Sequence, residues 1–174
     1  MAEKKKIIAL TTDPYDNIYG YALIFMKLFD YIQNNNKNIS IILISNDGVC
    51  SKKINNHKFV KIKLNSELPL VIKTLLSICQ FVRKVWSYNK NITLIANSEI
   101  TELISVFILT IKFKKVYCLI QDLQLRDQLL KTKIIYQLRL FLIYRIKNVI
   151  FSNNYTMGQL NNSINKFYIG NPIF

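Results

Sequence analysis

The sequence contains 174 residues, 51% of them hydrophobic, a length that suits one well-packed domain and is short for two. Lysine and arginine number 24 against 10 acids, so the formal net charge is +14 at pH 7. This balance attracts nucleic acid, anionic lipid or phosphorylated ligands without choosing among them, and a solvated basic surface is the simpler alternative.

The rarer residues exclude several kinds of site. Cys50, Cys79 and Cys118 lie far apart without paired spacing, so they indicate neither a disulfide framework nor a zinc site. His57 is the only histidine, which excludes a metal site built from several histidines. No apolar run is long enough to span a bilayer, and no signal peptide is apparent. We expect a cytoplasmic protein with no metal and no tightly bound cofactor, at most peripheral to a membrane.

The first segment of the chain is predicted to organise the fold. Residues 7–10 form an apolar strand and 11–17 a polar loop, and apolar positions spaced three and four residues apart then predict a helix over 18–32. This pattern is typical of the opening unit of a parallel α/β sheet. In such sheets the first strand is central, and ligands bind outside the carboxyl ends of the strands.

The remaining elements alternate between strand and helix. Further strands are predicted at 39–45, 59–64, 92–96, 115–120, 149–152 and 167–169, and further helices at 68–88, 99–113, 125–147 and 155–160. The strand at 59–64 is expected near the sheet edge. Because hairpin signals are missing, this alternation predicts a single-domain, doubly wound parallel sheet of the Rossmann-like α/β class.

Two of the predicted helices carry expectations about packing. The buried face of helix 68–88 is expected to consist of Val71, Ile72, Leu75, Cys79, Val82, Val85 and Trp86. Its opposite face would hold Lys73, Ser77, Gln80 and Lys84. Helix 99–113 is apolar nearly all round, so we expect it to pack between the sheet and another layer. Asn97 and Ser98 are good caps for its start.

Polar residues collect where the predicted strands end. They are Thr11, Thr12, Asp13, Tyr15, Asp16, Asn17, Asn46, Asp47, Asn97, Ser98, Glu99, Gln121, Asp122, Asn153 and Asn154. Parallel strands would bring them to one edge of the sheet, although each alone also suits a turn or a helix cap. A dinucleotide fingerprint needs three glycines, and the first loop offers only Gly20. A conventional nucleotide-binding Rossmann domain is therefore not expected.

A resemblance to a known family begins at the strand 116–120. That strand, followed by Gln121, Asp122 and Leu123, resembles the strand ending in His-Asp-hydrophobic in the N-terminal domain of GT-B glycosyltransferases, above all family 4-like enzymes. The later segments 148–160 and 167–172 are similar to that family's next strand and helix and to the strand before its interdomain crossover. Residues 17–21 stand where the family has its glycine-rich loop.

This sequence departs from the family pattern in three ways. Gln121 replaces the histidine that the family often places near the reacting sugar, and the usual glycine pair of the loop is reduced to Gly20. The chain stops at Phe174, where a second, donor-binding Rossmann-like domain should begin. We therefore expect residues 1–174 to supply only the acceptor-side domain. Three alternatives follow: an excised domain, a half that pairs with a separate donor-binding subunit, or a remnant used for binding.

The resemblance implies sugar transfer from a nucleotide-sugar co-substrate to a hydroxyl acceptor, which needs a base and stabilisation of the leaving diphosphate. Asp122 is the candidate base, with Asp13 and Glu99 as substitutes, and a helix cap is the equally open alternative for Asp122. Arg126 would pair with a phosphate on a lipid-linked or phosphorylated acceptor. The remaining substrate-binding candidates are Tyr15, Asn17, Tyr19, Gly20, Asn97, Gln121 and Asn153. The expected partners are the acceptor and a donor-binding subunit or a second copy of the chain.

The alternative to an enzyme is a basic binding module without catalysis. The lysines between Lys52 and Lys63, with Phe59 and Tyr88 for stacking, would serve nucleic acid, although no recognised nucleic-acid motif is present. Docking on an anionic membrane would use Lys4 to Lys6, the same lysine-rich segment and helix 125–147, and it is compatible with the enzyme hypothesis.

Overall fold

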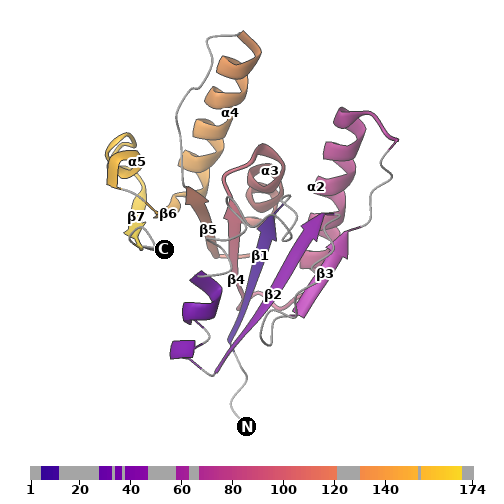
Figure 1. The fold of residues 1–174 in the computed structure, drawn as a ribbon, viewed down its shortest axis with the longest axis vertical. Helices are drawn as coiled ribbons and strands as arrows, with labels where there is room; N and C mark the ends of the chain where they lie inside the picture. The colour runs from indigo at the N-terminus through magenta and orange to yellow at the C-terminus, as the bar shows by residue number, and fades with distance from the viewer. Residues whose placement is uncertain are drawn as a thin grey trace.

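The computed structural model describes residues 5–11, 28–32, 34–36, 38–46, 58–62, 67–120, 130–152 and 154–169. Its strands are β1 (Lys5–Thr11), β2 (Ile39–Asn46), β3 (Lys58–Ile62), β4 (Thr93–Asn97), β5 (Lys115–Ile120), β6 (Asn148–Phe151) and β7 (Asn165–Tyr168). Its labelled helices are α2 (Leu70–Trp86), α3 (Ile100–Leu109), α4 (Leu130–Ile146) and α5 (Asn154–Gly158) (Figure 1). Residues 28–32 and 34–35 are also helical.

The described strands form one seven-stranded sheet in the order β3-β2-β1-β4-β5-β6-β7, and every pairing is parallel. The predicted doubly wound Rossmann-like sheet, with β1 inside it and β3 at an edge, is confirmed. The chain moves outward from β1 to β2 and β3, then returns to the other side of β1 to form β4. The strand order therefore reverses between β1 and β4, which is where such sheets bind ligands.

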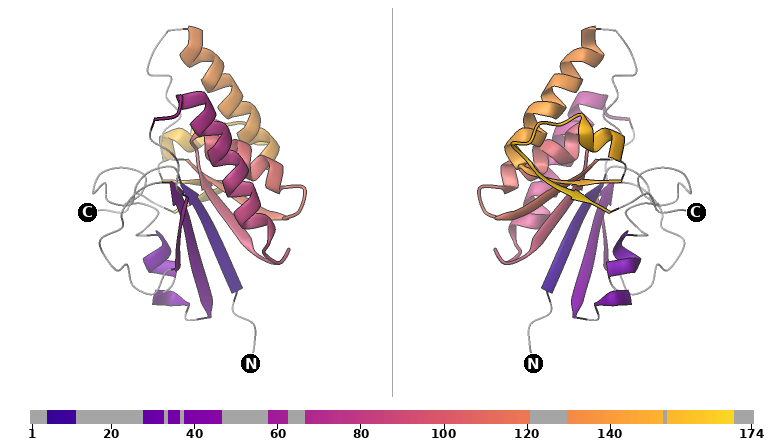
Figure 2. Two further views of the ribbon diagram at one scale, coloured as in Figure 1. Left: turned by 90° about the vertical axis from the view of Figure 1, so that its right-hand side faces the viewer. Right: turned by 90° about the vertical axis from the view of Figure 1, so that its left-hand side faces the viewer.

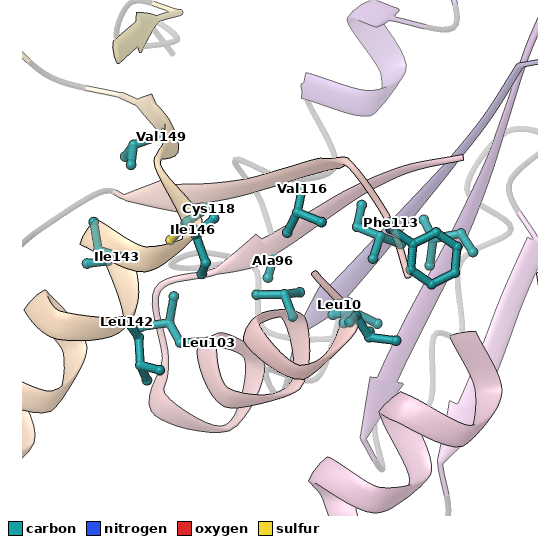
Figure 3. Close-up of a cluster of buried hydrophobic side chains, with 14 of the residues drawn as sticks. Leu10, Ala96, Leu103, Phe113, Val116, Cys118, Leu142, Ile143, Ile146 and Val149 are labelled. Carbon is teal, nitrogen blue, oxygen red and sulfur yellow. The ribbon is translucent and has the colours of Figure 1, made fainter. Parts of the chain in front are cut away.

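Alternate residues of the strands supply the cores on the two faces of the sheet. Ile8 and Leu10 of β1 belong to the larger cluster, which α2, α3 and α4 cover, whereas Ala9 belongs to the smaller cluster with Phe29. Figure 2 shows the three helices on one side of the sheet and the short helical segments 28–32 and 34–35 on the other. Figure 3 shows Leu103 of α3 and Leu142 of α4 beside the strand residues of the larger cluster.

Helix α2 packs on the sheet through a different face from the one predicted. The residues that it buries are Ser77, Ile78, Phe81 and Val85. Five members of the predicted buried face, Val71, Ile72, Leu75, Cys79 and Trp86, are exposed. Val85 is buried as predicted, and Val82 packs against the core. The prediction for the other five was wrong because apolar residues occupy most of the circumference of this helix, and their periodicity does not say which part of a broad apolar arc faces the sheet. Ser77, expected on the polar face, lies in the interface.

Helix α3 ends earlier and is capped differently than the sequence suggested. It begins after Glu99, which has extended backbone angles and makes no side-chain capping hydrogen bond, so neither Asn97 nor Ser98 is the cap. It ends at Leu109, and a turn then leads to the buried Phe113. The helix packs between α2 and α4 in the same layer. No further layer of described residues covers it, since Ile111 just beyond its end is 81% exposed.

Candidate functional site

The carboxyl ends of β1 and β4 lie side by side at the point where the strand order reverses. Leu10 pairs with Ala96, so the next residues along each strand, Thr11 and Asn97, come together at the edge of the sheet. On its other side, Asn97 pairs with Leu119 of β5. Because all strands are parallel, this edge is where the loops after the strands meet.

Asn97 lies at this edge with its side chain fully buried. Its Oδ1 accepts a hydrogen bond from the backbone N–H of Ser98 at 2.8 Å, which fixes the start of the turn between β4 and α3. Its Nδ2 is buried and has no hydrogen-bond acceptor among the described residues. A substrate would therefore reach this amide only if the neighbouring groups moved.

Arg139 of α4 holds the same turn from the neighbouring helix. Its Nε donates to the carbonyl oxygen of Ser98 at 2.9 Å, and its Nη2 donates to the Ser98 hydroxyl at 3.1 Å. Hydrogen bonds from an ionised guanidinium are stronger than those between neutral groups, and two of them fix the relative orientation as well as the distance. Asn97 and Arg139 together position the backbone between β4 and α3.

Glu99 and the first turn of α3 stand next to this braced turn. Glu99 is half-buried, and its carbonyl oxygen accepts a hydrogen bond from the N–H of Leu103 at 2.9 Å. The first backbone N–H groups of a helix lack partners within the helix and carry partial positive charge, so this terminus favours anionic groups. The edge thus combines a carboxylate with N–H donors, which suits both deprotonation of a hydroxyl and contact with a phosphate.

Cys118 lies in β5, next to the strand that leads into this turn, and its thiol is unreactive. Burial raises the pKa of its thiol far above the ordinary value, Arg139 opposes that rise, and Glu102 adds to it. Glu102, on the first turn of α3, is fully buried. The thiol is therefore not a nucleophile near neutral pH. Within the described ranges, no three side chains of the His, Cys, Asp or Glu types are grouped so that they could hold a metal ion.

Most of the sequence-predicted site lies outside the described residues. That applies to Asp13, Tyr15, Asn17, Tyr19, Gly20, Gln121, Asp122, Arg126 and Asn153. Of the candidates, only Asn97 and Glu99 are placed, and both stand at the carboxyl edge. The sequence did not single out the contact between Arg139 and Ser98, because 41 residues separate them and nothing local signals a pairing.

Two surface hollows lie away from this edge. One, of about 350 Å³, is at the amino ends of the strands and is lined by Lys5, Lys6, Asn89, Asn91 and Lys115, among others. The other, of about 510 Å³, is an apolar groove between α2 and α3 that includes Cys79, Val82, Trp86 and Ile108. Neither is at the strand ends where parallel sheets of this kind bind their ligands, so we keep the carboxyl edge as the candidate site.

No protein-family model and no curated protein matched the sequence. A solved structure does match the fold: UDP-N-acetylglucosamine 2-epimerase from Rickettsia bellii, with a TM-score of 0.63 and 11% sequence identity. The match covers 96% of this chain and 45% of that chain, so this chain spans less than half the length of its structural neighbour. It supports a GT-B-like, Rossmann-type fold and does not single out family 4 of the glycosyltransferases.

Proposed function

We propose that this chain is the acceptor-side domain of a GT-B-type glycosyltransferase, which works with a donor-binding domain to transfer a sugar from a nucleotide-sugar to a hydroxyl acceptor. The observation that carries the proposal is the agreement of nearly the whole chain with part of a GT-B-like protein named for a nucleotide-sugar reaction. The braced turn at the reversal of strand order adds a local reason to place the acceptor at the carboxyl edge.

The proposed chemistry assigns roles to residues at this edge. The acceptor hydroxyl gives its proton to a carboxylate while its oxygen bonds to the anomeric carbon, and the bond from that carbon to the nucleoside diphosphate breaks. Asp122 is the proposed base, with Asp13 and Glu99 as substitutes. Arg126 would bind a phosphate on a lipid-linked or phosphorylated acceptor.

The second proposed set of residues would line the acceptor cleft. It consists of Tyr15, Asn17, Tyr19, Gly20, Gln121 and Asn153, all of them outside the described residues. Asn97 was predicted in the same set. Because Asn97 is buried, we assign it the role of holding the turn at Ser98 in place. The other residues remain proposals from the sequence.

The two edges of the sheet give a direct test of where a sugar binds. We would titrate the full ¹⁵N-labelled chain with octyl glucoside below its micelle concentration and follow the backbone amide resonances. Shifts at Ser98, Glu99 and Ile100 of the carboxyl edge are expected. Shifts confined to Asn89, Asn91 and Lys115 at the amino edge would contradict the proposed acceptor site. A parallel titration with methyl glucoside, which has the sugar without the octyl chain, separates sugar effects from alkyl-chain effects.

A further inference from the structure

Helix α2 presents an apolar stripe to solvent. Its buried residues Ile78, Phe81 and Val85 face the sheet, and the residues on the opposite side of the helix point outward. This outward stripe consists of Ile72, Leu75, Leu76, Cys79 and Trp86. Leu75 is 58% exposed and Trp86 43%. A helix of an ordinary globular domain carries polar residues on this side, so the stripe indicates a contact with something outside the domain.

The two neighbouring helices repeat the pattern. The buried side of α3 includes Val106 and Leu109, and its exposed apolar residues are Phe107 and, just beyond its end, Ile111. The buried side of α4 includes Leu142 and Ile143, and the residues Ile134, Leu138 and Phe141 are exposed. All three helices pack on the same face of the sheet (Figure 2). Their outward residues therefore form one surface, which we call the apolar helix face. It consists of Ile72, Leu75, Leu76, Cys79, Trp86, Phe107, Ile111, Ile134, Leu138 and Phe141.

Basic side chains border the apolar helix face. Exposed cations on or beside the three helices are Arg83, Lys84, Lys133 and Arg145, with the half-buried Lys112 between α2 and α3. Lys112 Nζ lies 5.6 Å from the centre of the Trp86 ring and donates to the Trp86 carbonyl oxygen. Arg145 lies 5.2 Å from the centre of the Phe141 ring. Within α2, α3 and α4 the only acid is Glu102, which is fully buried.

We infer that the apolar helix face docks on the surface of an anionic lipid bilayer. Aliphatic and aromatic side chains would enter the region between the headgroups and the acyl chains, while the lysine and arginine heads remain at the level of the phosphates. The proposed contact runs along the bilayer surface. Among the described residues, no helix is both long and apolar enough to cross a membrane.

Charge favours this occupant over two others. A second copy of the chain would bring the same cations face to face, without exposed acids on these helices to pair with them. Nucleic acid would neutralise the cations. However, it contacts proteins through its phosphates and stacked bases, and exposed isoleucine and leucine side chains add little to such binding. An anionic bilayer satisfies both the charges and the apolar area.

Trp86 makes the inference measurable because it is the only tryptophan of the chain. We would float the chain of residues 1–174 with vesicles of phosphatidylcholine alone or with about one third phosphatidylglycerol. Binding is expected to be at least about tenfold stronger to the anionic vesicles and to weaken with salt. Trp86 emission should move to shorter wavelength and be quenched by brominated acyl chains. Equal binding to both vesicle types, or no quenching, would overturn the inference.

Matched variants separate this face from the general charge of the protein. The triple substitution Leu75→Ser, Ile111→Ser and Phe141→Ser should lower vesicle binding about tenfold or more, since each removes exposed apolar area. The control triple Tyr31→Ser, Tyr155→Ser and Ile169→Ser changes exposed residues elsewhere and should bind as the wild type does. Circular dichroism checks that both variants fold. Equal losses in the two triples would count against the proposed surface.

A charge-reversal pair tests the basic border in the same way. Arg83→Glu with Arg145→Glu should lose binding to anionic vesicles, whereas Lys5→Glu with Lys115→Glu, at the amino edge of the sheet, makes the same change in net charge and should retain it. A different result would assign this face to a second copy of the chain. In that case the wild type would sediment as a dimer and not bind vesicles, and the apolar triple variant would sediment as a monomer. Flotation does not measure sugar transfer. Its result therefore tests membrane docking independently of the proposed function.

Discussion

Arg139 and Ser98, 41 residues apart in the chain, are joined by two hydrogen bonds from one guanidinium, to the carbonyl oxygen and to the hydroxyl of the serine. The first residue belongs to α4 and the second to the turn after β4. This contact ties the layer formed by α2, α3 and α4 to the edge at which the strand order reverses. It makes the position of the turn depend on how α4 packs.

Removing the guanidinium should therefore make the turn at Ser98 less well fixed and lower the stability of the fold. We expect Arg139→Ala to lower the free energy of unfolding by about 2 kcal/mol, because it deletes two charge-assisted hydrogen bonds at a half-buried position. Arg139→Lys should recover only part of the loss, since an ammonium cannot reproduce the paired geometry. Urea unfolding measures both. The control is the exposed Arg145→Ala, which should stay within about 0.5 kcal/mol of the wild type.

The orientation of α2 can be checked by two truncations on its opposite sides. Phe81 is completely buried, so Phe81→Ala should cost about 3 to 5 kcal/mol of stability. Leu75 projects into solvent, and Leu75→Ala should change stability by about 0.5 kcal/mol or less. Comparable losses of stability in the two variants would mean that α2 is rotated about its axis and does not face the sheet through Phe81.

Alkaline conditions should reveal the buried thiol of Cys118. Burial raises its pKa in the folded protein, so above its ordinary value of 9.0 the unfolded chain releases this proton while the folded chain keeps it. Stability is therefore lost as the pH rises above about 9, by up to about 1.4 kcal/mol per pH unit. Cys118→Ala should show a shallower decline in urea unfolding across this range. Leu75→Ala, at an exposed position without an ionisable group, should keep the wild-type slope.

Lys147 connects α4 to β6 in a left-handed conformation that suits glycine. Its φ is 68°, its N–H donates to the carbonyl oxygen of Ile143 at 3.0 Å, and its own carbonyl oxygen accepts from the N–H of Asn165 at 2.7 Å. A side chain in this region costs about 1 to 2 kcal/mol, part of which glycine gives back through its freedom in the unfolded chain. Lys147→Gly should raise the free energy of unfolding by about 0.5 to 1 kcal/mol. Lys147→Val should lower it, and thermal unfolding distinguishes the two.

The proposed base is tested by removing its charge while keeping its shape. With a donor-binding subunit present, Asp122→Asn should lower transfer of label from radioactive nucleotide-sugars about 100-fold or more. Glu99→Gln should have a smaller effect, since Glu99 is the substitute candidate. Unchanged turnover in Asp122→Asn would remove that residue from the mechanism and favour its alternative role as a helix cap.

The strands were predictable because their signal is local. Buried parallel strands are continuous apolar segments, such as 39–45 and 115–120, and the chain alternates them with longer periodic segments. The central position of β1 follows from a general rule for such alternations, whereas the order of the other strands was not predicted. The buried face of a helix is harder to predict, as α2 demonstrates. Its apolar arc is broad enough to serve both the core and the outer surface, and only the surrounding helices and strands decide which side faces inward.

The location of the candidate site at the carboxyl edge of the sheet could be predicted, but its long-range side-chain contacts could not. Parallel strands guarantee that Asn97 and the other residues after them share one edge. The guanidinium of Arg139 acquires its role only when a helix from late in the chain packs beside α3. That role leaves no mark in the residues nearby in sequence, whereas the hydrogen bond between Asn97 and Ser98 joins sequence neighbours.

The central place of β1 in the sheet has a consequence for how the protein is made. Ile7 pairs with Ile41 on one side and with Thr93 on the other. As the chain leaves the ribosome, one side of β1 can be covered early, whereas the other stays open until β4 has been synthesised. Closing such a long loop slows folding, and the open strand is prone to aggregation meanwhile. We therefore expect the nascent chain to depend on chaperones until synthesis has passed residue 97.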